Sequence, residues 1–393
     1  MPTKTVPARV LTGGEAVAEA MRQIDPDVVP VYPITPQTPI IQGFARFVAN
    51  GRARAEIVNV ESEHSAMSAA IGSALAGART ITATSSQGLA LMAEVLYIAA
   101  AMRAPIVMAL GNRALSGPIN IHCDHSDSML VRDSGAIQLF AENAQEAYDL
   151  MLMAPRVAEH PDVLLPVLVC QDGFTITHSA EPVVLVPDAK ARRFVGEYSV
   201  PFPLLDVALP TTQGPFTMPD YYYEVRYQQV AAMGAALAVI EEVAADYERI
   251  SGRRYDVVEA YELEDADRAI VCLGSTAGTI KDAVDELRAE GERVGLLELH
   301  SFRPLPVERL RNELRFVQNV AVLDRADSPG GWPPLYAELA AVLEETDVRL
   351  RSFVYGLGGR ELHPEDARNV LTELMSPHRT PAYIGLRGSA CPA

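Results

Sequence analysis

Short apolar runs alternate with helical patterns over the first 170 residues of the chain. Each run is followed by a segment in which apolar positions recur at helical spacing. Five runs predict strands: Val28–Tyr32, Glu56–Val60, Thr80–Thr84, Ile106–Leu110 and Leu164–Val169. Between Glu63 and Gly77 most residues are small, which suits a helix packed closely against a sheet or another helix. The alternation is typical of an α/β unit built on a parallel sheet.

The pattern changes after residue 182. Seven of the 28 prolines fall within residues 182–219, where periodicity fades, so we expect an extended connector there. A long amphipathic helix is predicted next, because apolar residues recur from Val230 to Tyr247 at spacings of three and four. Four further strands are predicted, with a helix over Thr279–Glu290 that Gly291 would cap. They are Ala269–Leu273, Val294–Leu299, Val320–Leu323 and Arg349–Tyr355.

Composition supports two compact units. With 393 residues, 49% of them apolar and 21% charged, the chain is long enough for more than one core and has a globular composition. We expect a first domain over residues 1–245, with the connector near 182–219, and a smaller α/β domain over residues 246–393. The net charge of -18 disfavours nucleic acid and anionic lipid as partners. Neither a secretory signal nor an apolar run of about 18 residues is recognisable, so we expect a cytoplasmic protein.

The four cysteines are scattered. Cys123, Cys170, Cys272 and Cys391 form no C-x-x-C pair, so we expect neither a disulfide framework nor a zinc or iron–sulfur site on this chain. The segment Ile121–Asp127 holds five possible metal ligands, but without the spacing that would place them on one helix face. We expect a hydrogen-bonded loop there, and the role of Cys123 stays open.

Polar residues follow several predicted strands, at the edge where open parallel sheets bind ligands. Thr35 stands in a proline-rich loop that would fix its hydroxyl toward an anion, although a turn that starts a helix is the alternative. Glu61 and Glu63 begin a small-residue helix, where they either act as caps or as a catalytic carboxylate. The turn Ser85-Ser86-Gln87-Gly88 could line a cofactor or form an ordinary N-cap. Arg113 could clamp a carboxylate in a bidentate fork or form a structural ion pair.

Two further motifs resemble cofactor sites only in part. Gly274-Ser275-Thr276-Ala277-Gly278 follows a predicted strand and opens a helix, but it lacks the G-x-G-x-x-G spacing of a dinucleotide site. Gln171-Asp172-Gly173 is similar to the start of the magnesium-diphosphate motif of thiamine-diphosphate enzymes. The asparagine that completes that motif is missing, since the nearest one downstream is Asn312. The chain therefore lacks a diphosphate anchor of its own.

Four motifs in one order resemble the alpha subunit of pyruvate:ferredoxin oxidoreductase, in the wider 2-oxoacid:ferredoxin oxidoreductase family. They are Tyr32–Pro36, Glu61–His64, Thr84–Met92, and Asp124–Asp127 with Arg132–Gly135. The resemblance covers nearly the whole chain, including the turn Leu299–Pro306. It implies an α/β thiamine-diphosphate-binding fold, with a pyrimidine-binding domain followed by a domain similar to the C-terminal one of transketolase.

The resemblance also implies roles for individual residues. A glutamate of the first domain hydrogen-bonds N1′ of the aminopyrimidine in this family, and the match is Glu63, with Glu61 as the fallback. Thr35 and Arg113 match the residues that hold the 2-oxoacid carboxylate, and Ser85–Gln87 match a cofactor-lining turn. The family loop often has glycine or asparagine where Cys123 stands in this chain.

The implied reaction is the oxidative decarboxylation of a 2-oxoacid, most readily pyruvate, with coenzyme A, while electrons pass to ferredoxin. The beta subunit would anchor the diphosphate with Mg²⁺ and carry a [4Fe–4S] cluster, beside gamma and ferredoxin-like delta subunits. Branched-chain 2-oxoacids and 2-oxoglutarate stay open as substrates. The alternatives are the beta component of a 2-oxoacid dehydrogenase and a nucleotide-binding or purely structural subunit.

Overall fold

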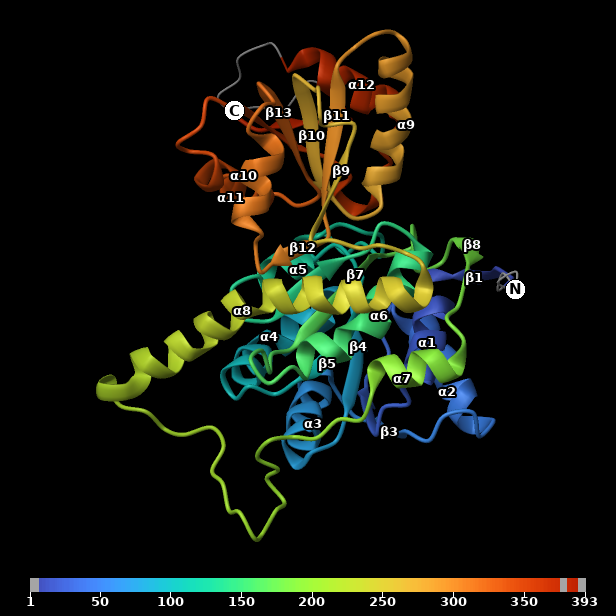
Figure 1. The fold of residues 1–393 in the computed structure, drawn as a ribbon, viewed down its shortest axis with the longest axis vertical. Coiled ribbons are helices and arrows are strands. Elements are labelled where there is room, and N and C mark those ends of the chain that lie inside the picture. The colour runs from blue at the N-terminus through green and yellow to red at the C-terminus, as the bar shows by residue number, and fades with distance from the viewer. Residues whose placement is uncertain (1–6, 375–379, 388–393) are drawn as a thin grey trace.

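The computed structural model describes residues 7–374 and 380–387, and Cys391 lies outside these ranges. Two sheets lie one above the other along the longest axis of the molecule (Figure 1). The lower sheet has seven strands and the upper sheet six. A two-stranded ribbon of β1 (Arg9–Thr12) and β8 (Ala180–Val183) lies near the N-terminus. The mixed α/β class predicted from the sequence is confirmed.

The lower sheet is parallel except at one edge, and its order is β12-β6-β7-β5-β4-β2-β3. Its strands are β2 (Val28–Val31), β3 (Glu56–Asn59), β4 (Thr80–Thr84), β5 (Ile106–Asn112), β6 (Ile137–Phe140), β7 (Val167–Asp172) and β12 (Ser301–Arg303). One face is covered by α1 (Gly13–Ile24), α2 (Thr38–Ala49), α6 (Ala144–Ala158), α7 (Asp188–Val195) and α8 (Pro219–Ser251). The other face is covered by α3 (Glu63–Ala76), α4 (Ser86–Ala101) and α5 (Ser126–Leu130). Because both faces are covered, every residue of the central strands β4, β5 and β7 is buried, as is usual for parallel strands.

The helix that follows β3 shows why the chain folds as it does locally. The Ser62 hydroxyl accepts a 3.2 Å hydrogen bond from the Ser65 amide, which caps the start of α3. The helix ends at Gly77, whose φ of 106° needs a residue without a side chain. Buried small residues between these ends let α3 pack against α4 and β4, as the sequence predicts. These caps place Glu63 in the first turn of the helix.

The upper sheet has the order β15-β14-β13-β10-β11-β9, with only β9 antiparallel to its neighbour. Its strands are β9 (Val258–Tyr261), β10 (Arg268–Leu273), β11 (Val294–Leu299), β13 (Asn319–Asp324), β14 (Arg349–Val354) and β15 (Ala382–Tyr383). The helices α9 (Thr276–Ala289) and α12 (Pro364–Glu373) cover one face, and α10 (Val307–Leu314) and α11 (Pro334–Val342) cover the other. A short 3₁₀ turn at Leu357–Gly359 follows β14.

Three predictions about individual elements are wrong. The strand predicted from Leu164 begins at Val167, because Leu164 has a φ of 45° and its amide bonds to His160. The connector is not extended throughout: α7 forms in its proline-free part and is tied down where Arg22 and Gln23 bond to Asp188. The turn Leu299–Pro306 contains β12, which pairs with β6.

The strand β12 joins the two sheets, because it follows the upper strand β11 in sequence but pairs with the lower strand β6. The predicted domain division at residue 245 falls within α8, whose last turns lead to β9. Among the described helices, none has both the length and the apolar character needed to cross a bilayer.

Candidate active site

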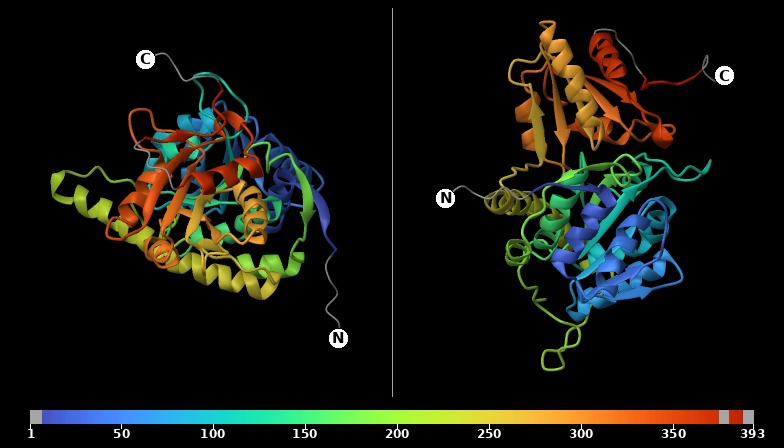
Figure 2. Two further views of the ribbon diagram at one scale, coloured as in Figure 1. Left: turned by 90° about the horizontal axis from the view of Figure 1, so that it is seen from above. Right: turned by 90° about the vertical axis from the view of Figure 1, so that its right-hand side faces the viewer.

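The strands β2, β4, β5 and β7 are close neighbours in the lower sheet, and their carboxyl ends meet at one edge. We call this the carboxyl edge. It carries the loop after β2, the turn Ser85–Gly88 and Arg113, as the sequence predicts from the strand ends. The upper sheet lies over the same edge (Figures 1 and 2), so the site is closed on one side by the second half of the chain.

Glu63 lies in the first turn of α3 with its side chain buried. A Cβ atom at Gly88 would lie 2.7 Å from Glu63 Oε1, and closer still to Thr84 Oγ1. The carboxylate is therefore packed against the start of α4, where only glycine leaves room for it. Glu61 differs: it is exposed, its carboxylate accepts a hydrogen bond from Ser65, and that bond lowers its pKa. Of the two candidate carboxylates, Glu63 alone lies inside the site.

The turn after β4 is held in place by hydrogen bonds that Ser86 donates. Ser85 is fully buried, and its hydroxyl has no hydrogen-bond partner. Ser86 donates its amide to Asp127 Oδ2 at 2.9 Å and its hydroxyl to the Ala114 carbonyl at 2.6 Å. Gln87 is half-buried. Of these three predicted cofactor residues, Ser85 is the one whose hydrogen-bonding capacity is unused in the described chain.

Arg113 and Thr35 come together from two different strand ends. Arg113 Nη1 donates a 3.0 Å hydrogen bond to the Thr35 carbonyl, and Nε donates a 2.8 Å bond to the Asn120 carbonyl. No carboxylate of the described residues lies within 4 Å of the guanidinium, although its side chain is only 7% exposed. Burial lowers the pKa of Arg113, while Asp127 opposes that change. The Thr35 side chain is exposed at the same place.

Among the described residues the Arg113 guanidinium hydrogen-bonds only to neutral carbonyl oxygens, and Asp127 offsets part of its charge without forming an ion pair with it. A planar anion such as a carboxylate is the partner that a guanidinium binds most strongly. The alternative role for Arg113 is a structural ion pair. No carboxylate of the described residues lies within 4 Å of the guanidinium to form one. The geometry is therefore that of an arginine available to an anionic ligand.

Several buried polar atoms at the carboxyl edge lack hydrogen-bond partners within the described chain. They include Gln37 Oε1, Thr84 Oγ1, Ser85 Oγ, Asn112 Oδ1 and both amide atoms of Gln171. Buried polar groups are nearly always satisfied, so such a concentration points to a ligand that satisfies them. A Cβ at Gly111 would lie 3.2 Å from Ser85 Oγ and 3.5 Å from the backbone nitrogen of Gln37, so Ser85 and Gln37 lie next to each other at this edge.

Asp127 organises this edge, a role that sequence pattern alone does not assign to it. It is fully buried and accepts hydrogen bonds of 2.9 Å from the amides of Ser86 and Arg113 and from Asn112 Nδ2. Burial raises its pKa to about 6, although these donors oppose the change. The prediction of a hydrogen-bonded loop over Ile121–Asp127 is confirmed. The partners of Asp127 are Ser86 at the start of α4, Asn112 at the end of β5 and Arg113 just after it, which no local spacing reveals.

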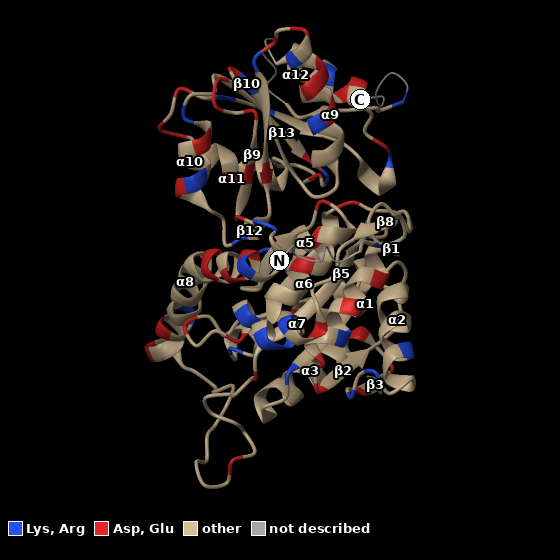
Figure 3. Ribbon diagram, turned by 45° about the vertical axis from the view of Figure 1, so that its right-hand side comes forward, with Lys and Arg blue, Asp and Glu red and all other residues tan. Residues whose placement is uncertain are grey.

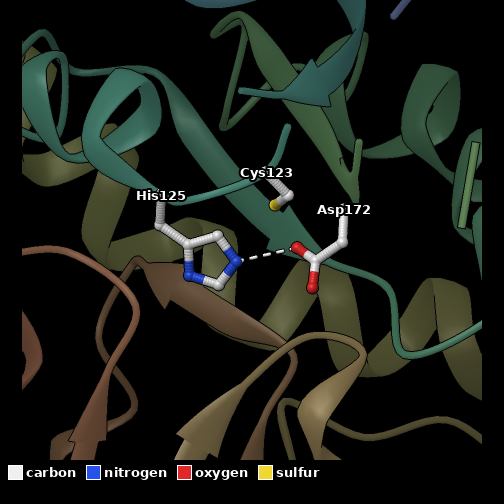
Figure 4. A group of neighbouring side chains, drawn as sticks. All are labelled: Cys123, His125 and Asp172. Carbon is white, nitrogen blue, oxygen red and sulfur yellow. Dashed lines mark hydrogen bonds and ion pairs between the residues drawn. The ribbon is translucent and has the colours of Figure 1, made fainter. Parts of the chain in front are cut away.

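Two residues of this loop, Cys123 and His125, lie close to Asp172 at the end of β7 (Figure 4). His125 Nε2 lies 2.8 Å from Asp172 Oδ1, and Arg325 Nη1 donates to Asp172 Oδ2 at 2.6 Å. Burial alone would raise the pKa of Asp172, but Arg325 and His125 lower it far below its usual value. Burial raises the pKa of the Cys123 thiol, which contacts the Asp124 carbonyl. Both oxygens of Asp172 are thus already engaged by donors of this chain.

The two incomplete motifs bind to one another. Asp172 Oδ2 accepts a 3.2 Å hydrogen bond from the Ser275 amide, and a second from the Ser275 hydroxyl. The Gln-Asp-Gly segment after β7 and the Gly-Ser segment after β10 therefore hold the two sheets together. The Asp172 carboxylate is therefore already engaged within this chain, whereas both side-chain amide atoms of Gln171 are unpaired among the described residues.

A second charged cluster joins the sheets further from the edge. Lys281 Nζ lies 2.9 Å from Glu142 Oε2 and 3.5 Å from Glu298 Oε2. His300 Nε2 lies 3.4 Å from Glu146 Oε2. Burial by itself lowers the pKa of His300, but Glu146 and Glu298 raise it to about 10. Lys281, His300 and the three glutamates therefore form a cluster of opposite charges between the two sheets.

Two family models match the chain. One, described as pyruvate flavodoxin/ferredoxin oxidoreductase, thiamine diP-bdg, covers residues 19–245. The other, described as pyruvate:ferredoxin oxidoreductase core domain II, covers residues 266–367. All the carboxyl-edge residues described above lie within the first match.

Curated relatives match along nearly the whole chain. It is 54% identical over 382 residues to pyruvate synthase subunit PorA of Thermotoga maritima, covering 96% of this chain and 97% of the relative. It is 48% identical over 383 residues to the subunit of the same name from Methanocaldococcus jannaschii, with coverages of 96% and 98%. Ketoisovalerate oxidoreductase subunit VorA of Pyrococcus horikoshii is 41% identical over 369 residues, or 93% of each chain.

Two solved structures share the fold. The 2-oxoglutarate:ferredoxin oxidoreductase from Magnetococcus marinus, with 2-oxoglutarate, coenzyme A and succinyl-CoA bound, has a TM-score of 0.75 at 20% identity, covering 95% of this chain and 66% of that chain. A split-gene transketolase, as an inactive beta4 tetramer, has a TM-score of 0.55 at 15% identity, with coverages of 93% and 99%.

Proposed function

The chain belongs to the family of pyruvate:ferredoxin oxidoreductase alpha subunits, as its motifs predict, and we propose that its carboxyl edge binds the aminopyrimidine of thiamine diphosphate beside a 2-oxoacid. The assembled enzyme then decarboxylates pyruvate oxidatively with coenzyme A, giving acetyl-CoA and CO₂, and passes electrons to ferredoxin. The main support for this site is that the Glu63 carboxylate is buried near polar atoms that have no hydrogen-bond partner in the described chain.

Thiamine diphosphate, when bound, supplies a carbon nucleophile and accepts the electron pair released as CO₂ leaves. The protein must hold the pyrimidine in the protonation state that generates this nucleophile. Glu63 Oε1 would accept a hydrogen bond from the ring nitrogen N1′ and stabilise the proton there. Its place against Gly88 fixes the direction of that bond. Ser85 and Gln37, both buried, supply further polar contacts to the ring.

Arg113 and Thr35 hold the carboxylate of the 2-oxoacid. The guanidinium is positioned by the Thr35 and Asn120 carbonyls, and these bonds use only Nη1 and Nε. Nη2 keeps its protons for an anion. The exposed Thr35 side chain follows β2, which is separated from β5 by β4 alone, so a carboxylate could be bound from two sides. A substrate fixed this way loses less entropy at the reaction step.

Partner subunits supply what this chain lacks. Because Asp172 is engaged by Arg325, Ser275 and His125, the incomplete diphosphate motif has no carboxylate free to hold Mg²⁺. We place the diphosphate, its Mg²⁺ and a [4Fe–4S] cluster on a beta subunit, with gamma and ferredoxin-like delta subunits carrying electrons to ferredoxin. The subunit names of the relatives support an assembly of several chains.

Pyruvate is the favoured substrate. Relatives named for pyruvate reach 54% and 48% identity, whereas the relative named for ketoisovalerate is 41% identical. A relative named for pyruvate from Methanosarcina barkeri is also 41% identical, so the support for pyruvate comes from the higher identity of the first two. The beta component of a 2-oxoacid dehydrogenase, the alternative enzyme, finds no support in the family matches.

The test compares two carboxylates in the assembled enzyme. Glu63→Gln keeps the shape of the side chain but removes the anionic acceptor, so turnover should fall by at least about 10²-fold. Glu61→Gln is the matched control, because it changes the same group two residues away on the exposed surface. Turnover with pyruvate and thiamine diphosphate retained after desalting should be measured for both. A near-normal Glu63→Gln enzyme beside an inactive Glu61→Gln enzyme would transfer the role to Glu61.

A further inference from the structure

Residues 197–230, which we call the arm, expose an unusual amount of apolar surface. The arm comprises the irregular end of the connector and the first turns of α8. Of the 24 large apolar side chains exposed in the described chain, 12 fall between residues 202 and 230. The most exposed are Val207 at 94%, Phe216 at 92% and Tyr223 at 78%. Figures 1 and 2 show the loop and the start of α8 extending away from both sheets.

The irregular part of the arm, before α8, is also nearly free of charge. Asp206 is the only charged residue between positions 198 and 219, in a chain whose net charge is -18. Figure 3 shows this loop almost entirely in tan, in contrast to the helices of the body. A connector exposed only to water is usually polar, because nothing offsets the cost of hydrating apolar groups. The composition is that of a segment covered by another protein.

The exposed area is large enough for a specific interface. The six exposed aromatic residues of the arm alone offer on the order of 600–1,000 Å² of apolar surface. The largest apolar patch on a typical monomer is about 300–600 Å². A standard interface buries about 800 Å² on each partner. The arm therefore reaches the size of a stable protein interface.

The position of the arm indicates which partner covers it. The Leu204 amide bonds at 2.9 Å to the Leu75 carbonyl in the last turn of α3, and Gly214 packs against Met102 at the end of α4. The opposite ends of the same two helices carry Glu63 and Ser86 at the carboxyl edge. With 14 and 16 residues, α3 and α4 are about 21 and 24 Å long. One folded subunit easily spans that distance.

The outer faces of these helices form a continuous surface between the two ends. Leu91 and Ile98 are 49% and 44% exposed on α4, and Gly72 on α3 faces open space. A subunit that brings a diphosphate anchor to the carboxyl edge would lie along this surface and meet the arm at its far end. We infer that the arm is the docking surface for the diphosphate-anchoring partner subunit, an inference that rests on the proposed function.

The test uses a double substitution in the arm of the full chain, co-expressed with its partner subunits. Val207→Asp with Phe216→Asp places two charges in the surface without touching the core, since both side chains are more than nine-tenths exposed. The matched control is Val10→Asp with Phe316→Asp, which makes the same changes at side chains 75% and 74% exposed elsewhere. The affinity of the tagged chain for the diphosphate-anchoring subunit is then measured by sedimentation. We expect the arm variant to bind at least about 10-fold more weakly and the control to bind within about 2-fold of wild type.

A second measurement needs no substitution. Limited proteolysis should cut the arm of the isolated wild-type chain, and the assembled enzyme should resist cleavage there. Undiminished affinity of the arm variant for the subunit overturns the inference. So does an isolated chain that is already dimeric with its arm protected, because a second copy would then be the occupant.

The test of the arm and the test of the proposed function can fail independently of each other. Glu63→Gln should leave the assembly intact, since it changes no group of the arm. If the arm variant loses the subunit while Glu63→Gln stays fully active, the docking surface stands and the catalytic assignment fails. An inactive Glu63→Gln enzyme with an arm variant that assembles normally gives the reverse conclusion.

Discussion

Asp172 and Arg325 form an ion pair of 2.6 Å between the two sheets, with side chains 1% and 7% exposed. Asp172 ends β7 of the lower sheet, and Arg325 follows β13 of the upper sheet. Because Ser275 and His125 bond to the same carboxylate, the pair has the additional hydrogen bonds that a buried ion pair requires. It holds the upper sheet over the carboxyl edge.

Removing one partner of this pair should destabilise the protein strongly. Arg325→Met leaves the Asp172 carboxylate buried without its cation, and we expect the free energy of unfolding to fall by about 3–5 kcal/mol. Urea titration of the purified chain measures this loss. The exposed Arg315 gives the matched control, because Arg315→Met should change stability by no more than about 0.5 kcal/mol. Equal stability of the two variants would show that the pair does not hold the sheets together.

Stability should also depend on alkaline pH through His300. Its folded pKa of about 10 lies above the ordinary value of 6.5, so its contribution is fully present below pH 6.5 and is lost as pH rises to about 10. In that window the free energy of unfolding should fall by at most about 1.4 kcal/mol per pH unit. Melting curves at successive pH values test this. His300→Gln should flatten the dependence and lower stability near neutral pH, while His363→Gln, at an exposed site, should do neither.

Local pattern predicts much of the fold. Runs such as Thr80–Thr84 and Val294–Leu299 form strands with the predicted bounds, because they are short and rich in β-branched or apolar residues. The helix α7 within the proline-rich connector was not predicted, since it is held by contacts of Asp188 with Arg22 and Gln23, about 165 residues away. Periodicity carries no information about such partners.

In the site too, features set by local sequence could be predicted, whereas contacts between distant residues could not. Strand ends and motifs bring Glu63, Thr35 and Arg113 to one edge, because the ends of neighbouring parallel strands meet there. Asp172 and Ser275 each resemble part of a cofactor site, yet they bind each other across 103 residues of sequence. Spacing within a motif cannot reveal that its polar groups are already engaged. The central role of Asp127 was missed for the same reason.

Asp127 is predicted to be a positioning residue for the carboxyl edge. Asp127→Asn puts an amide where the carboxylate accepts bonds from Ser86 and Arg113, so both groups should shift. We expect kcat/KM for pyruvate to fall by about 10- to 100-fold at pH 7.5. Since burial raises the Asp127 pKa to about 6, wild-type activity should also fall below about pH 6.

The pH profile separates positioning from simple loss of structure. If the acid limb of the wild-type profile reports Asp127, it should disappear in Asp127→Asn, leaving a lower but flatter activity. An unchanged limb in the variant would assign that titration to another group. A thermal melt of the variant checks that the fold is retained.

Arg113 and Thr35 are predicted to bind the carboxylate of the substrate. A charge-assisted hydrogen bond in a site shielded from water contributes roughly 1.5–3 kcal/mol. Arg113→Ala should therefore lower kcat/KM for pyruvate by about 10- to 100-fold or more, since 1.36 kcal/mol corresponds to a factor of ten. Thr35→Val removes one neutral donor and keeps the shape of the side chain, so its effect should be smaller.

Arg113 also has a structural contact that must be separated from substrate binding. Its bonds to the Thr35 and Asn120 carbonyls hold the loop after β2, so Arg113→Ala could act by loosening that loop. Thr35→Val keeps the Thr35 carbonyl and hence the loop contact, and Arg113→Lys keeps the charge without the planar fork. If substrate binding dominates, Arg113→Lys should lie between wild type and Arg113→Ala in kcat/KM, with melting temperatures close to wild type. Should Arg113→Ala lose activity only in step with its melting temperature, Arg113 is a structural residue and the substrate carboxylate binds elsewhere.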